Sequence, residues 1–226
     1  MTEAGTWAQK HLDYRFSNEE LLDQALTHRS AAATQNERLE FLGDAVLGLV
    51  IARILYDLKP LAQEGELSRY RACLVRRETL ASLARELDLG QQIRLGSGEA
   101  RSGGQQRDSV LADAFEALLG AILLDSDFET VQRVVAGLFQ SRIEILPPAT
   151  ELVDAKTALQ EWLQARGLPV PVYQLKEVTG SPHAQTFSAC CMVAALDRQT
   201  TGEGSSRRKA EQAAAARMLE LLSDDG

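Results

Sequence analysis

Two groups of acidic side chains occur in stretches that have the apolar periodicity of a helix. Glu37, Glu40 and Asp44 are spaced by three and four residues in one stretch, and a later stretch carries Asp113 and Glu116 three residues apart. On a helix these spacings place the side chains on one face, where like charges repel unless a cation lies beside them. Carboxylate oxygens are the ligands of hard divalent cations. The two groups together therefore predict a metal site.

The alternative is a solvated acidic face, which is the usual explanation of a single acidic pair on a helix. Two observations favour the metal site instead. The flanking residues are so apolar that neither helix has a broad polar side, and the arrangement occurs twice in the chain.

The elements that must position these carboxylates are helices, because no alternation typical of strands occurs before residue 148. A capping box at Ser17–Glu20 starts one helix, and the first acidic helix follows it. Another helix opens at Gly65, and its arginines either meet phosphates or form a solvated basic face. The glycine-rich stretch 96–106 predicts a loop that leads into the second acidic helix. A last helix spans roughly residues 128–142, so we expect an all-α N-terminal domain.

Pro147 and Pro148 break the chain and mark a linker. The pattern then changes to that of a small α+β domain with the order α-β-β-β-α. It predicts a helix, two clear strands, a weakly signalled third strand and an Ala-rich helix, over residues 154–165, 170–178, 186–196, 197–201 and 205–222 respectively.

The Ala-rich helix begins with three consecutive cations, Arg207, Arg208 and Lys209, directly after Ser206. Free backbone N–H groups and the helix dipole already favour an anion at a helix N-terminus. Cations at this position therefore predict a phosphate-binding site.

Composition limits the class of protein. The chain has 226 residues and a net charge of −8, and neither side of the linker is basic overall, so any affinity for nucleic acid has to come from local clusters. The longest uncharged apolar run, residues 45–52, is too short to cross a bilayer, and the N-terminus lacks a secretion signal. Cys73, Cys190 and Cys191 suggest neither a disulfide framework nor a zinc site, which favours a cytoplasmic protein with these residues in packing roles.

Five motifs give the chain a resemblance to the bacterial ribonuclease III family. E-R-L-E-F-L-G-D-A-V-L and S-V-L-A-D-A-F-E-A-L-L-G-A resemble the two nuclease motifs of that family. D-A-K-T-A-L-Q-E-W, G-S-P-H-A-Q-T-F and G-E-G-S-S-R-R-K-A-E-Q-A-A-A resemble a double-stranded-RNA-binding domain. The resemblance implies a catalytic domain over 6–146, a linker over 147–152 and an RNA-binding domain over 153–223.

The resemblance also implies roles for individual residues. In the nuclease domain it makes Asp44 and Glu116 catalytic, Glu37 an accessory acid and Phe41 a residue of a homodimer interface. The metal ligands would be Glu40, Asp44, Asp113 and Glu116.

In the second domain the resemblance places residues along duplex RNA. Gln160 and His183 would reach two successive minor grooves, while Ser206, Arg207, Arg208 and Lys209 would lie at the phosphates between them. The sequence departs from the common K-K-x-A-K pattern at Glu211, which puts a further helix cation in doubt.

The implied reaction is Mg²⁺-dependent hydrolysis of double-stranded RNA, with Mn²⁺ as a possible substitute. The cation would activate water for in-line attack, leaving 5′-phosphate and 3′-hydroxyl ends with short 3′ overhangs. A C₂ dimer would supply one site for each strand. The expected substrates are ribosomal RNA precursors and some messages.

Two other classes of protein stay open at this point. A pure double-stranded-RNA-binding protein would use the nuclease domain only for dimerisation, but the four intact carboxylates argue against it. A helical metal-binding interaction protein unrelated to RNA is disfavoured by the C-terminal motifs. Failure to bind duplex RNA would restore that second alternative.

Overall fold

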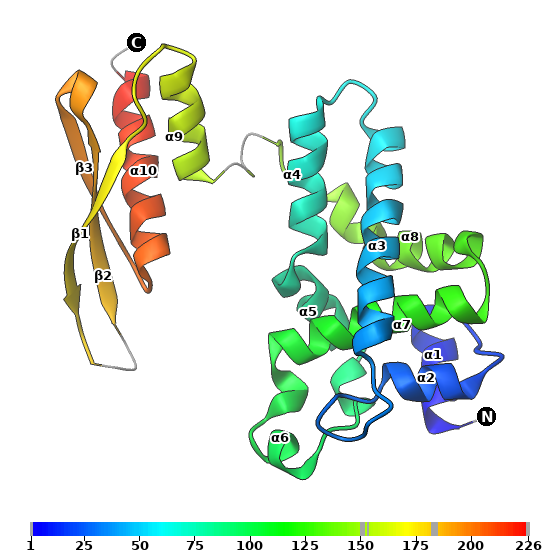
Figure 1. Cartoon of the computed structure of the whole chain (residues 1–226). Coiled ribbons are helices and arrows are strands. Elements are labelled where there is room, and N and C mark those ends of the chain that lie inside the picture. Colours follow the sequence, from blue (N-terminus) through cyan, green and yellow to red (C-terminus); the bar gives the residue numbers. More distant parts are fainter. Residues whose placement is uncertain (1, 150–151, 153, 182–184, 225–226) are drawn as a thin grey trace. The chain divides into compact units, whose positions relative to one another are not determined.

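Helix α7 (Asp108–Asp125) is the central helix of the first 150 residues. It is apolar on nearly all sides, and eleven of its eighteen residues are buried. Four helices pack on it: α2 (Glu19–Ala25), α3 (Glu37–Leu58), α5 (Arg77–Glu86) and α8 (Phe128–Glu144). Figure 1 shows α7 among them in the computed structural model. Polar side chains on α7 are therefore held within a packed core.

The first unit also contains α1 (Glu3–Leu12), α4 (Glu64–Val75) and the short 3₁₀ turn η1 (Leu89–Gln91), besides the two short turns described below. Helix α2 starts one residue later than the predicted capping box implies. Asn18 is its N-cap and accepts the Glu20 N–H, while the Ser17 N–H is taken up by the Asp125 carboxylate.

The helix predicted from Gly65 is in fact two helices. Arg76 is extended, with φ −67° and ψ 151°, and it separates α4 from α5. The Thr79 hydroxyl donates to the Cys73 carbonyl at 2.8 Å, which satisfies an acceptor that the end of α4 leaves free. Periodicity alone does not detect this break, because residues on both sides of Arg76 are helical.

The glycine-rich stretch was predicted to be a loop, but two parts of it form short helical turns. It contains α6 (Ser97–Arg101) and the 3₁₀ turn η2 (Gly104–Gln106), joined at Gly103 with φ 76°. The Arg107 guanidinium bonds the Glu99 carboxylate at 2.6 Å and ties α6 to the start of α7. The Glu99–Arg107 bond thereby holds this segment at the N-terminus of α7.

The C-terminal region is α+β, as expected. Its elements are α9 (Ala155–Gln164), β1 (Val172–Thr179), β2 (Thr186–Val193), β3 (Arg198–Gly204) and α10 (Arg207–Asp224), with a 3₁₀ turn η3 at Ala194–Leu196. The strands form an antiparallel sheet in the order β1-β2-β3, and the weakly signalled third strand is present.

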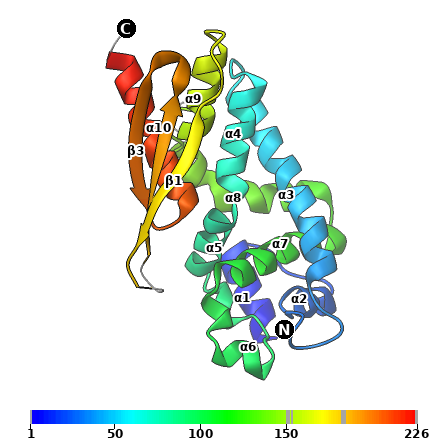
Figure 2. The ribbon, with the colours of Figure 1, turned by 60° about the vertical axis from the view of Figure 1, so that its left-hand side comes forward.

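Helices α9 and α10 cover one face of this sheet (Figures 1 and 2). The core between them combines leucines of α9 with alanines and Met218 of α10 and residues of β2. Cys190 and Cys191 are buried in β2 and Cys73 is half-buried, and all three are free thiols. This agrees with packing roles.

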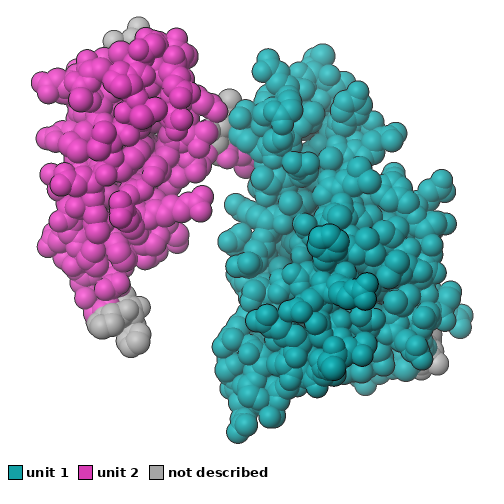
Figure 3. All heavy atoms as spheres, viewed as in Figure 1, with its two compact units in different colours: residues 1–150 teal, residues 151–226 magenta. Residues whose placement is uncertain are grey.

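The structure describes residues 2–149, 152, 154–181 and 185–224, which divide into two compact units, 1–150 and 151–226 (Figure 3). The first unit is all-α and the second is α-β-β-β-α, which confirms the predicted fold class. No helix of the described residues is both long and apolar enough to cross a membrane.

Candidate catalytic and RNA-binding sites

A cavity of about 630 Å³ lies between α3 and α7 in the first unit. Its lining comes from α3, from α7, from the segment after α2 and from the folded glycine-rich segment. All five predicted carboxylates of the nuclease domain line it, and so does Phe41. The helical spacings therefore gather these acids at one place although they are up to 79 residues apart in the sequence (37 to 116).

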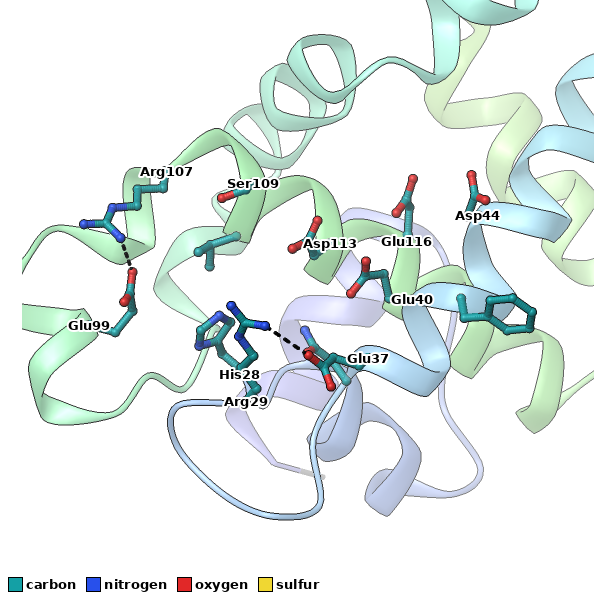
Figure 4. Close-up of a pocket in the computed structure, with 13 residues that line it drawn as sticks. His28, Arg29, Glu37, Glu40, Asp44, Glu99, Arg107, Ser109, Asp113 and Glu116 are labelled. Carbon is teal, nitrogen blue, oxygen red and sulfur yellow. Dashed lines mark hydrogen bonds and ion pairs between the residues drawn. The ribbon is translucent and has the colours of Figure 1, made fainter.

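Three of the carboxylates form a close group. Glu40, Asp113 and Glu116 each offer an oxygen within 4.8 Å of the others, and all three residues are half-buried. Figure 4 shows Glu40 on α3 beside Asp113 and Glu116 on α7. Asp44 lies further along α3 on the same cavity, but it is exposed and outside this group of three. Glu37 lies on the rim, where Gln35 and Arg29 bond its two oxygens at 2.8 and 3.4 Å.

Two glycines allow the helices to come this close. A Cβ at Gly43 would lie 1.7 Å from the Glu116 carbonyl oxygen, and a Cβ at Gly120 would lie 2.2 Å from the Leu39 carbonyl oxygen. Helices α3 and α7 therefore touch backbone to backbone. This contact places Glu40, one turn before Gly43, against the face of α7 that carries Glu116.

The carboxylates repel one another in the absence of a cation. Burial, followed by the charges of Asp44, Glu40 and Asp113, raises the pKa of Glu116 to about 8. Burial and then the Asp113 charge raise the pKa of Glu40. Burial also raises the pKa of Asp113, although Arg77 leads the nearby cations that oppose the shift.

Several residues of the cavity wall were not predicted as site residues. Glu99 comes from the segment expected to be a loop, Arg107 is the N-cap of α7, and Ser109 lies in the first turn of α7. His28 follows α2 and belongs to the same wall. Its Nδ1 is 2.8 Å from the Ser30 hydroxyl, and the residue is half-buried. No local signal in the sequence links these residues to α3 and α7.

The ligand atoms fit a hard divalent cation. The close group supplies oxygen donors and no nitrogen or sulfur, as Mg²⁺ and Mn²⁺ prefer. A bound cation would also offset the repulsion that raises the pKa values of these acids. The cavity leaves space beside the group for a substrate phosphate.

In the second unit, the predicted RNA-binding residues that the structure describes lie on α9 and at the start of α10. Gln160 is exposed on α9, and Arg207, Arg208 and Lys209 are exposed on the first turn of α10. The Ser206 hydroxyl accepts the Lys209 N–H at 3.3 Å, as a cap of α10 would. His183 lies outside the described residues.

Comparisons with known proteins agree with this arrangement. Residues 18–142 match the family described as Ribonuclease-III-like, and residues 155–222 match the double-stranded RNA binding motif. Ribonuclease 3 of Pasteurella multocida (strain Pm70) is 51% identical over 222 residues, which cover 98% of this chain and 99% of that protein. The chain belongs to the ribonuclease III family.

Solved structures of this family support the assignment. Two structures of the nuclease domain of ribonuclease III from Campylobacter jejuni align with TM-scores of 0.60 and 0.61 at 40% and 37% identity. They cover 62% and 65% of this chain and 98% and 100% of those chains. The chain is therefore an endoribonuclease of the ribonuclease III type, with a double-stranded RNA binding motif after its nuclease domain.

Proposed function

We propose that this ribonuclease III family member is a Mg²⁺-dependent homodimer that cleaves double-stranded RNA. It leaves 5′-phosphate and 3′-hydroxyl ends with short 3′ overhangs, and it acts in the cytoplasm on ribosomal RNA precursors and some messenger RNAs. The observation that carries the proposal is the close group of Glu40, Asp113 and Glu116 beside an open cavity.

The carboxylates serve as cation ligands, as a catalytic pair and as an accessory acid in the proposed reaction. Glu40, Asp113 and Glu116 hold the cation, and Asp44 is the fourth ligand, on the exposed side of the same cavity, where a scissile phosphate can approach. When bound, Mg²⁺, or Mn²⁺ in its place, supplies Lewis acidity and lowers the pKa of a water. Asp44 and Glu116 are the catalytic pair, and Glu37 is an accessory acid that Arg29 and Gln35 hold at the rim.

Dimerisation is supported by an apolar stripe on α3. Phe41, Leu49 and Tyr56 are 80%, 58% and 69% exposed, and spacings of eight and seven residues put them on one side of the helix. Exposed large apolar side chains in a row mark an interaction surface. One of the Campylobacter jejuni structures is described as showing flexibility in a region involved in dimer formation. A C₂ dimer across this stripe would provide two catalytic sites, one for each RNA strand.

The second unit is proposed to deliver the duplex. Gln160 on α9 and the cations of α10 are exposed on the two helices that cover the sheet, as shape readout of A-form RNA requires. Ser206 caps the helix that presents the cations, and His183 is assigned to the second minor groove.

Cleavage of a perfectly paired RNA duplex tests the proposed activity. The native chain with Mg²⁺ should cut both strands, and Glu116→Gln should reduce cleavage by about a thousandfold, because several kcal/mol of transition-state stabilisation are lost. The variant should keep its duplex affinity, and Ca²⁺ should support binding without cleavage. Duplex binding without cleavage by the native chain under all these conditions would show a binding protein instead.

Sedimentation tests the proposed dimer. Phe41→Ser should shift the chain toward monomer, because it removes the most exposed apolar side chain of the α3 stripe. Val178→Ser, which alters a 42% exposed valine of β1 in the other unit, is the matched control. Equal dimer fractions in the two variants would contradict the assignment of this surface.

A further inference from the structure

Glu211 is the only charged residue that is buried among the residues whose burial the structure describes. It is 8% exposed, yet it stands four residues into the cationic start of α10. A carboxylate loses its hydration on burial and is retained only where cations and hydrogen bonds replace the water. The groups that bond the Glu211 carboxylate therefore indicate its role.

Two cations from different helices share this carboxylate. Lys156 of α9 donates to Oε2 at 2.6 Å, and Arg207 of α10 donates through Nε to Oε1 at 2.9 Å. These two bonds hold the pKa of the Glu211 carboxyl below its usual range. Because the Arg207 bond uses Nε, the two terminal nitrogens of the guanidinium are left for a phosphate.

The network extends to the sheet and to a second link between the helices. The Lys156 ammonium lies 4.3 Å from the centre of the Tyr173 ring of β1. The Lys156 backbone N–H donates to the Gln212 side chain at 3.1 Å. Glu211 and Gln212 thus hold the first turn of α9 against the second turn of α10, and Lys156 links both to the sheet.

The other two cations of the triplet are held differently. Arg208 is 84% exposed, and its contact with Asp154 is 3.9 Å long. The Lys209 ammonium has no hydrogen-bond or ion-pair partner among the described residues. Arg207 is therefore the one cation of the three with a short bond that fixes its side chain.

We propose that Glu211 is a positioning residue for duplex RNA, which fixes the Arg207 guanidinium and the distance between it and Gln160 on α9. The inference rests on the proposed RNA-binding function. Gln160 stands one helical turn after Lys156, so the Lys156–Glu211 bond ties the minor-groove contact to the phosphate contact. A-form RNA is recognised by its shape, and that recognition requires a fixed spacing between groove contacts.

The direction in which one substitution changes RNA affinity distinguishes positioning from simple charge repulsion. Glu211→Gln removes a negative charge beside a phosphate-binding helix. If Glu211 only repels RNA, its removal tightens binding, whereas loss of positioning weakens it despite the gain in positive charge.

The experiment measures duplex RNA affinity of the full chain in the Glu116→Gln background, so that the RNA stays intact. Glu211→Gln should weaken binding by roughly tenfold, as is typical of residues within one network. The matched control is Glu220→Gln, which makes the same charge change at an exposed position of α10 and should leave binding equal or slightly tighter. Equal or tighter binding by Glu211→Gln would overturn the positioning role alone. Absence of duplex binding by the chain with native Glu211 would overturn the proposed RNA-binding function, and this inference with it.

A double-mutant cycle distinguishes positioning from general loss of structure. In an Arg207→Gln background, Glu211→Gln should cost less than about twofold in affinity, because the side chain that it positions is already gone. The same tenfold loss in both backgrounds would overturn the proposal.

Two further readouts complete the test. With native Glu116, the Glu211→Gln variant should raise KM for duplex cleavage while kcat at saturating RNA stays unchanged; an equal fall in kcat would contradict positioning. If Glu211→Gln fails to fold, Glu211→Asp replaces it. Aspartate keeps the charge but is too short to reach both cations, so positioning predicts weaker binding and repulsion predicts no change.

Discussion

The two units handle clustered charge in opposite ways. In the first, Glu40, Asp113 and Glu116 crowd together; burial raises all three pKa values, and repulsion from neighbouring acids adds to the shifts of Glu40 and Glu116. In the second, the buried carboxylate of Glu211 is matched by two cations, and its pKa is lowered. The first site is incomplete without an external cation. The second is complete and offers its remaining donors to an external anion.

The difference shows how a chain with a net charge of −8 can act on RNA. The acids of the first unit attract the metal that the reaction requires, and a bound metal reverses the local sign of charge where phosphate must approach. The cations of the second unit are positively charged without a metal. Overall charge is therefore a poor guide to the partner, while the placement of each charge is informative.

Among the tests of this difference between the units, the largest effect on stability should come from separating α3 and α7. Gly43→Ala places a methyl group 1.7 Å from the Glu116 carbonyl oxygen, so the helices must move apart. We expect the first unit to lose about 3 kcal/mol of unfolding free energy, and cleavage to fall with it. Gly48→Ala on the same helix, where nothing lies within 4 Å, should be neutral or stabilising by up to about 1 kcal/mol. Denaturant unfolding measures both, and equal effects would contradict the close contact.

An intermediate effect should appear in the dependence of stability on pH. Glu116 has a folded pKa of about 8 against its usual 4.5, so between these values the folded chain keeps a proton that the unfolded chain releases. The unfolding free energy of the first unit should therefore fall as pH rises from about 5 to 8.

Melting curves at pH 6 and pH 8, with chelator and with Mg²⁺, check this expectation. Mg²⁺ should raise the melting temperature of the first unit more at pH 8, and Glu116→Gln should remove most of that difference. A Mg²⁺ effect that is the same at both pH values would show that the acids are not crowded as described.

The smallest effect should come from the second unit. Lys209→Gln removes an ammonium that has no partner among the described residues, so folding stability should stay within about 0.5 kcal/mol. Duplex affinity should fall a few-fold, and the slope of log K against log salt should decrease by about one. Filter binding at several salt concentrations measures this slope, and an unchanged slope would exclude a phosphate contact at Lys209.

Much of this arrangement could be predicted from local patterns. The apolar period identified α3 and α7, and the i, i+3 and i, i+4 spacings selected the acids that line the cavity. The change of pattern after Pro148 separated the helical unit from the α+β unit.

The remainder depended on contacts that are distant in sequence. Gly43 and Gly120 were present in the quoted motifs, but their role appears only when the two helices cross. The five-residue helix α6 is too short to give a clear period, and the Glu99–Arg107 pair ties it to α7. In the sequence Glu211 is a departure from a cationic pattern, and its partner Lys156 stands 55 residues earlier.

The central place of α7 also has a consequence for biosynthesis. Helices α2, α3 and α5 are synthesised before residues 108–125, and until α7 is made the faces that pack on it have no partner. The first hundred residues should therefore stay unfolded or bound to chaperones until α7 emerges, and truncations before Asp108 should aggregate. The second unit has its own core, so its folding can follow as a separate event.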